Sequence, residues 1–318
     1  MRKGDGKKAV RKDGFFKRLF GFGNKKVTEK HVNLVREHFK KLEKHNKKKL
    51  KELSKVATIK AKKPMRTGIK GFDSFFDKNE GIRQGSSVLI EGGPGSGKTL
   101  FCLNTLNNLC KEGKKCLYMS FEEPEENLIS HMKNFGWKPE EYIKKGLLRI
   151  SRFDAIDVSR SIEALLSAAK KELKIEVDPI FFPEDFEPDF VVIDSLTSIS
   201  SAFSGESSRF RIYMEQLFRY LENHKITNFL VREVSSPTHI GTVFQEQGSA
   251  VSFLSDGIIV IYNVIHNSGK RGVAIEILKM RGTSFKKKIV EMQIVDKKGI
   301  IVNPKKILSR KKNNFELT

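Results

Sequence analysis

The residues from Gly92 to Thr99 have the types and the spacing that suit phosphate binding. They read Gly-Gly-Pro-Gly-Ser-Gly-Lys-Thr and fit the pattern G-x-x-x-x-G-K-[ST] of a phosphate-binding loop, or P-loop. Glycines let the backbone curl so that successive N–H groups point at phosphate oxygens. Lys98 would reach the β- and γ-phosphates, and the Thr99 hydroxyl would ligate Mg²⁺. The pattern predicts ATP-type nucleotide binding by Gly92, Gly93, Pro94, Gly95, Ser96, Gly97, Lys98, Thr99 and Leu100.

Two apolar segments elsewhere run directly into acidic residues. Residues 190–193 precede Asp194, and an aspartate at the end of such a strand can hold Mg²⁺, directly or through water. Residues 118–121 precede Glu122 and Glu123, and a glutamate there can orient and deprotonate the attacking water. We expect Glu122 to be the base and Glu123 its helper. In the alternative interpretation, all three acids simply cap the helices that follow them.

Elements must bring these residues together, and the hydrophobic pattern from Thr67 onward predicts a parallel α/β sheet. The strand candidates are short apolar runs: Ser87–Ile90, Cys116–Phe121, Leu147–Ser151, Phe190–Ile193, Asn228–Val231, Gly257–Tyr262 and Val273–Met280. Helical spacing is seen in Leu100–Lys111, Pro124–Phe135, Val158–Lys174 and Ser208–Asn223. Residues 286–302 are expected to form a hairpin that turns at residues 296–299.

The net charge of +22 lies at the two ends of the chain. Residues 1–66 carry 24 basic and 6 acidic residues, residues 303–318 carry 5 and 1, and residues 67–302 carry 31 of each. We therefore expect four parts: a basic, mostly disordered tail with a short amphipathic Phe-rich element (1–26), a basic amphipathic helix (27–63), the α/β domain (64–303) and a basic C-terminal tail (304–318).

The basic residues 1–63 suggest a polyanionic partner. One candidate is nucleic acid, whose phosphates attract lysine-rich arms. The other is an anionic membrane surface, because Phe15, Phe16, Leu19 and Phe20 would share one face of a helix near many lysines. The same face would also suit a groove of a partner protein, or the phenylalanines could fold back onto the body of the protein.

Cysteine usage and hydropathy bear on the compartment. The three cysteines (Cys102, Cys110 and Cys116) show no metal-ligand spacing, and an odd number of thiols fits a reducing environment. No apolar run approaches the roughly 18 residues of a membrane-spanning helix. We expect a cytoplasmic protein, with peripheral membrane association as the alternative, and we expect Cys102 and Cys110 to be core residues.

In order and spacing, the motifs resemble those of the KaiC-like branch of the RecA superfamily of ATPases, in its single-domain archaeal type. The resemblance spans about residues 64–302. It rests on the P-loop and on five further segments: Thr67–Asp73, Gly81–Gly85, Phe121–Glu123, Asp194–Thr197 and Lys279–Thr283. It implies a RecA-like P-loop core with a mostly parallel central sheet flanked by helices and a C-terminal β-hairpin, ATP and Mg²⁺ as cofactors, and ATP hydrolysis.

The resemblance also implies residue roles and an assembly. Glu122 and Glu123 match the catalytic glutamates of the branch, and Asp194 matches its magnesium aspartate. The family forms a ring, often hexameric, with ATP at each subunit boundary. Lys279 and Arg281 would then project toward the γ-phosphate that the neighbouring subunit holds. From the sequence alone they are alternate basic side chains of a strand, which an exposed sheet face would also explain.

The chain departs from the clock protein that names the branch. It carries one such domain instead of two, and no segment matches that protein's phosphorylated residues well, so timing and autophosphorylation do not carry over. Three functions stay open: a ring-forming ATPase in signalling or assembly with an unknown protein client, a nucleic-acid-dependent ATPase related to RecA and RadA, and a membrane-tethered nucleotide-switch scaffold with little turnover.

Overall fold

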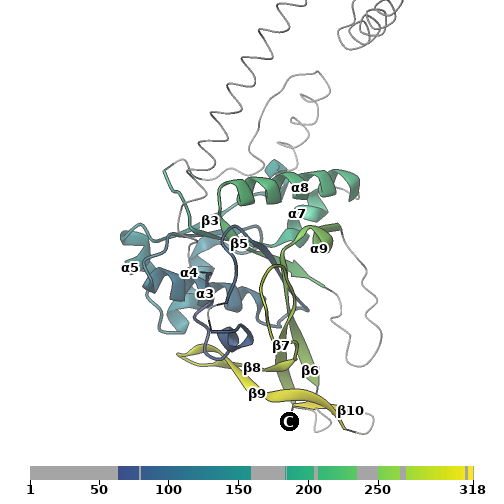
Figure 1. Cartoon of the computed structure of the whole chain (residues 1–318). Helices are drawn as coiled ribbons and strands as arrows, with labels where there is room; N and C mark the ends of the chain where they lie inside the picture. Colours follow the sequence, from purple (N-terminus) through teal and green to yellow (C-terminus); the bar gives the residue numbers. More distant parts are fainter. Residues whose placement is uncertain are drawn as a thin grey trace, which may run out of the picture. The chain divides into compact units, whose positions relative to one another are not determined.

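In the computed structural model, the predicted P-loop and the acidic residues predicted around it lie within residues 63–318 (Figure 1). The described residues are 64–78, 80–158, 183, 185–203, 207–234, 250–265, 270–311 and 314–317. The tail predicted over residues 1–26 and the helix predicted over residues 27–63 lie outside them. So does the helix predicted over residues 158–174, except for its first residue.

The described residues form a ten-stranded sheet with the order β10-β9-β8-β7-β6-β1-β5-β4-β2-β3. Six strands run parallel: β1 (Ser87–Gly92), β2 (Cys116–Ser120), β3 (Leu148–Arg152), β4 (Phe190–Asp194), β5 (Thr227–Glu233) and β6 (Gly257–Ile265). Four antiparallel strands extend the sheet beyond β6: β7 (Arg271–Met280), β8 (Val290–Val295), β9 (Gly299–Lys311) and β10 (Asn314–Leu317). The fold is therefore the α/β class that the sequence predicts, with the P-loop strand β1 between β5 and β6.

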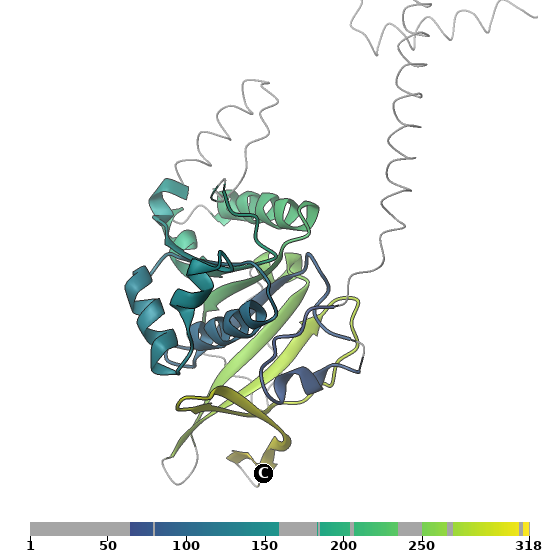
Figure 2. The ribbon, with the colours of Figure 1, turned by 90° about the vertical axis from the view of Figure 1, so that its left-hand side faces the viewer.

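Helices cover both faces of the sheet (Figures 1 and 2). The 3-10 helix η1 (Phe72–Phe75) and helices α3 (Lys98–Lys111), α4 (Glu125–Asn134) and α5 (Pro139–Lys144) pack on one face. Helices α7 (Leu196–Ala202), α8 (Ser207–Asn223) and α9 (Ala250–Leu254) pack on the other. None of these described helices combines the length and the apolar character needed to cross a bilayer.

Strand β1 is covered by the core on both faces of the sheet. Val88 and Ile90 point into the core on the α3 side, Leu89 points into the core on the α8 side, and all three are fully buried. A parallel strand covered on both faces becomes a continuous apolar run rather than an alternating one. The same logic accounts for β4 and β5, which were also predicted from short apolar runs.

The region after residue 303 differs from the expected tail. Strand β9 continues to Lys311, pairs with β8 through Val290 and Ile307, and pairs again with β10. Leu308 packs against the core on the α8 side. Residues 304–311 therefore extend the sheet, because apolar side chains sit between the lysines that suggested a solvated tail. The hairpin turn predicted at residues 296–299 is confirmed, and Cys102, Cys110 and Cys116 are all buried.

Candidate functional site

The P-loop connects the carboxyl end of β1 to the first residue of α3, Lys98. Gly95 and Gly97 have φ angles of 68° and 94°, a left-handed region that favours glycine. At Gly92, an added Cβ would lie 2.5 Å from Ser96 Oγ and 2.7 Å from the carbonyl oxygen of Ile261. The loop thus requires glycine for two reasons, backbone conformation and close packing, and it opens onto a helix N-terminus that favours anions.

Two side chains brace this loop. Lys98 Nζ donates to the carbonyl oxygen of Gly93 at 2.9 Å, and Asn263 Nδ2 of β6 donates to that of Pro94 at 3.1 Å. The Lys98 ammonium therefore already lies over the loop, where a phosphate could replace its carbonyl acceptor. Asn263 carried no signal in the sequence, because its role depends on the pairing of β6 with β1.

Asp194, at the end of β4, lies beside the first turn of α3. Its Oδ2 accepts hydrogen bonds from Thr99 Oγ1 at 2.9 Å and from Tyr118 Oη at 2.5 Å. Burial raises the pKa of the Asp194 carboxyl, while the hydrogen bonds from Tyr118 and Thr99 oppose that rise. A buried carboxylate joined to a hydroxyl is a set of hard oxygen donors, so Thr99 and Asp194 fit the ligand chemistry of Mg²⁺.

Glu122 and Glu123 follow β2 and face different partners. Glu122 Oε1 accepts hydrogen bonds from the hydroxyls of Ser195 and Ser198, the latter at 2.8 Å. Glu123 Oε2 lies 3.6 Å from Nδ1 of His131, a residue of α4. The structure therefore brings both predicted glutamates to the same edge of the sheet as Asp194. Their assignment as base and helper stays a prediction.

A pocket of about 310 Å³ opens beside the P-loop. It is lined by Gly95, Gly97, Lys98, Thr99, Leu100, Leu103, Glu123, His131, Asn134 and Phe135. Its volume is at the lower end of the range for small-molecule sites. Sequence reasoning missed the three residues contributed by the end of α4, because the helical pattern identifies the buried face of α4 and not the rim of a pocket.

Lys279 and Arg281 are not near the P-loop of their own chain. Ile258 of β6 pairs with both Lys279 and Leu89 of β1, and the backbone N–H of Arg281 donates to the carbonyl of Asp256, whose own N–H donates to Ser87 at the start of β1. The P-loop leaves β1 at the opposite end. Arg281 lies level with Ser87, five residue steps from Gly92, and Lys279 lies level with Leu89, three steps from it, which at about 3.3 Å each is roughly 16 Å and 10 Å along β1. Both side chains bond to carbonyls of residues 252–255 and not to the P-loop.

Comparison with known proteins identifies the family. The model of the family described as "ATPase: KaiC" matches residues 65–307. The chain belongs to the KaiC family of ATPases. This KaiC-family chain is 31% identical over 252 residues to the UPF0273 protein PH0284 of Pyrococcus horikoshii, covering 78% of this chain and 97% of that protein. It is 28% identical over 243 residues to the circadian clock protein KaiC3 of Synechocystis, covering 76% of this chain but only 45% of that protein.

A solved structure supports the same conclusion. The KaiC-like protein PH0186 from Pyrococcus horikoshii matches 76% of this KaiC-family chain and 99% of its own, with a TM-score of 0.58 and 26% identity. The family that the sequence motifs resemble and the RecA-like fold are thus both confirmed. Family membership supports ATP binding and ATPase function.

Proposed function

We propose that this chain hydrolyses ATP with Mg²⁺ at sites shared between copies of a homo-oligomeric ring. The P-loop, Asp194, Glu122 and Glu123 of one copy would supply the nucleotide site, and Lys279 and Arg281 would come from the next copy. The observation that carries the proposal is the separation of the two sets of residues. Lys279 and Arg281 lie level with Leu89 and Ser87 of β1, and their side chains bond to carbonyls of residues 252–255 and not to the P-loop. If both sets act on one triphosphate, they must belong to different chains.

Each group has a defined task in this proposal. The P-loop N–H groups and Lys98 would hold the phosphates, while Thr99 and Asp194 would hold Mg²⁺, which neutralises phosphate charge when bound. A glutamate carboxylate would accept the proton of the attacking water. Lys279 and Arg281 would stabilise the charge that develops on the transferred phosphoryl group, as arginine fingers do. A hexamer is the ring size that the family resemblance implies.

Complementation between two inactive variants tests the shared site. One variant, the P-loop donor, carries Lys279→Ala and Arg281→Ala; the other, the cation donor, carries Lys98→Ala. Each alone is expected to lose ATPase activity by about 10²-fold or more. Random 1:1 mixing restores a complete site at about one in four boundaries of a ring, so activity should recover to about a quarter of that of the unmodified protein. A mixture as inactive as its components would overturn the proposal.

The basic residues 1–63 support a second element of function, a polyanionic partner for the ATPase. Their excess of lysine and arginine favours nucleic acid or an anionic membrane as that partner. The protein client of a signalling or assembly role would engage through the same ATP cycle. ATPase rates measured with single-stranded RNA, duplex DNA or phosphatidylserine vesicles, each at low and high salt, distinguish these partners. Rates that none of the three changes would leave a protein client as the remaining candidate.

A further inference from the structure

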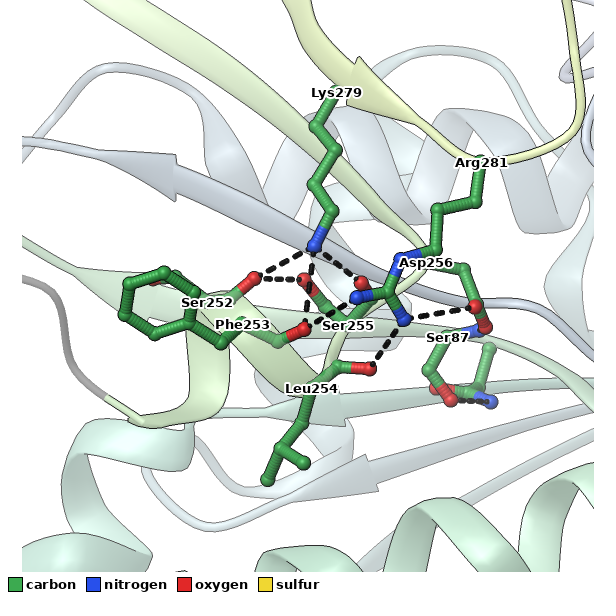
Figure 3. Close-up of polar contacts among 9 residues, drawn as sticks. Ser87, Ser252, Phe253, Leu254, Ser255, Asp256, Lys279 and Arg281 are labelled. Atoms are coloured by element: carbon green, nitrogen blue, oxygen red, sulfur yellow. Dashed lines mark hydrogen bonds and ion pairs between the residues drawn. The ribbon is translucent and has the colours of Figure 1, made fainter.

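The C-terminal turn of α9 holds both cations of the proposed shared site (Figure 3). Lys279 Nζ donates to the carbonyl oxygens of Ser252, Phe253 and Ser255 at 2.9, 3.4 and 2.7 Å. Arg281 donates to the carbonyl of Phe253 at 2.7 Å and to that of Leu254 at 3.4 Å. Carbonyls at a helix C-terminus lack intrahelical partners and carry partial negative charge, so they attract cations. The position of this turn therefore sets the position of Lys279 and Arg281.

A second connection reaches the same turn from the P-loop end of the sheet. Arg232 of β5 lies opposite Glu91 of β1 in the strand register, and Glu91 directly precedes Gly92. Arg232 Nη2 donates to Glu91 Oε1 at 2.6 Å and to Ser252 Oγ at 3.0 Å. The hydroxyl of Ser252 thus accepts from Arg232, while its carbonyl accepts from Lys279. The buried Ser252 therefore joins Arg232, which lies level with Glu91, to Lys279, which lies level with Leu89.

The Glu91–Arg232 pair is not explained by stability alone. The side chains of Arg232 and Glu91 are only 18% and 11% exposed. Removing two charges from water costs about as much as their attraction returns, and apolar residues of similar size often pack equally well at such a position. The pair also fixes the orientation of the Arg232 guanidinium, because a planar group bound to both a carboxylate and a hydroxyl has little freedom to rotate.

We propose that Arg232 is a positioning residue. Through Ser252, it links the P-loop strand β1 to the turn of α9 whose carbonyls bind Lys279 and Arg281. The inference rests on the proposed shared site. Through this link, the nucleotide site of one copy orients the cations that the same copy presents to its neighbour. In this proposal Arg232 acts on Lys279 and Arg281 through Ser252 of α9.

Ser252→Ala is the sharpest test, because it removes the hydroxyl and leaves the Glu91–Arg232 pair and the backbone carbonyls in place. The substitution is introduced separately into the cation donor (Lys98→Ala) and into the P-loop donor (Lys279→Ala with Arg281→Ala). In mixtures, we expect kcat to fall about ten-fold or more when the cation donor carries Ser252→Ala, with KM unchanged. No loss is expected when the P-loop donor carries it. A purely structural role would lower activity in both mixtures.

Two further variants keep the test decisive. Arg232→Met combined with Glu91→Gln removes the link without leaving a buried unpaired charge, and it should reproduce the loss selective for the cation donor. Ser201→Ala is the matched control, because the Ser201 hydroxyl is exposed and donates only within α7, to the carbonyl of Thr197. Equal losses in both mixtures, a loss confined to the P-loop donor, or no loss in either would overturn the inference. If the parent mixture recovers no activity, the shared site itself fails and the inference fails with it.

Discussion

We predict that Asp194, whose carboxylate is proposed to hold Mg²⁺, lowers the free energy of unfolding of the protein. Burial raises the pKa of its carboxyl, so ionisation disfavours the folded state. The penalty is absent below the pKa of the unfolded chain, grows as the pH rises toward the folded-state pKa, and is complete above that value. Asparagine has nearly the same shape as aspartate but does not ionise, so we expect Asp194→Asn to be more stable than the unmodified protein at neutral pH.

The contacts of Asp194 set the size of the gain. The carboxylate accepts two hydrogen bonds, from Tyr118 and Thr99. Each loses about 1 kcal/mol when its acceptor becomes neutral, about 2 kcal/mol together. Against this, burying a charged group costs several kcal/mol, and the raised pKa indicates that burial prevails. The net gain should be about 1–3 kcal/mol, or a rise in Tm of roughly 2–12 °C for a domain of this size.

Thermal unfolding without nucleotide and with EDTA measures this gain without ligand effects. The difference in Tm should shrink as the pH falls through the range in which Asp194 protonates, and ATPase activity should fall about 10²-fold or more. Asp185→Asn is the control: this carboxylate is exposed, and its hydrogen bond with Arg149 lowers its pKa. It should show no gain in Tm and no loss of activity. A lower Tm for Asp194→Asn at neutral pH would refute the reasoning.

Two further predictions concern single hydrogen bonds, one between α3 and β9 and one to Glu122. Asn104→Ala should lower the free energy of unfolding by about 1–3 kcal/mol in a denaturant titration, because Asn104 Oδ1 accepts from the buried N–H of Ile300 at 2.8 Å; a change indistinguishable from zero would show that water replaces the amide. Ser198→Ala removes one of the two hydroxyls on Glu122, so kcat should fall several-fold, by analogy with other lost positioning contacts, while Tm changes little. Unchanged turnover by Ser198→Ala would argue against Glu122 as the base.

The core of the fold was predictable because its signals are local. The apolar runs of β1 and β4, the glycines of the P-loop and the aspartate that follows β4 all lie within short stretches of sequence. Burial on both faces of a parallel sheet produces such runs directly. The position of Asp194 beside Thr99 also followed, since the carboxyl ends of parallel strands meet at one edge.

What could not be predicted depends on contacts between distant segments. Glu91 and Arg232 lie 141 residues apart, and only the pairing of β1 with β5 brings them together. The continuation of β9 beyond residue 303 was missed because its lysines were counted without the apolar residues between them. The position of Lys279 and Arg281 level with Leu89 and Ser87 of β1, away from the P-loop, depends on the register of β6 with its two neighbours, which no local pattern encodes.

Because the P-loop and the two cations lie apart in each copy, the proposed shared site would join two unlike surfaces. A contact that joins unlike surfaces cannot be satisfied mutually by a pair, because each added copy leaves one P-loop and one cation pair exposed at the ends of the row. Only closure of the row into a ring covers both of these exposed surfaces. An assembly built on this contact would therefore be head-to-tail. A closed ring would have one complete catalytic site per copy, whereas an open row would have one site fewer than its number of copies, so the activity per copy would depend on ring closure.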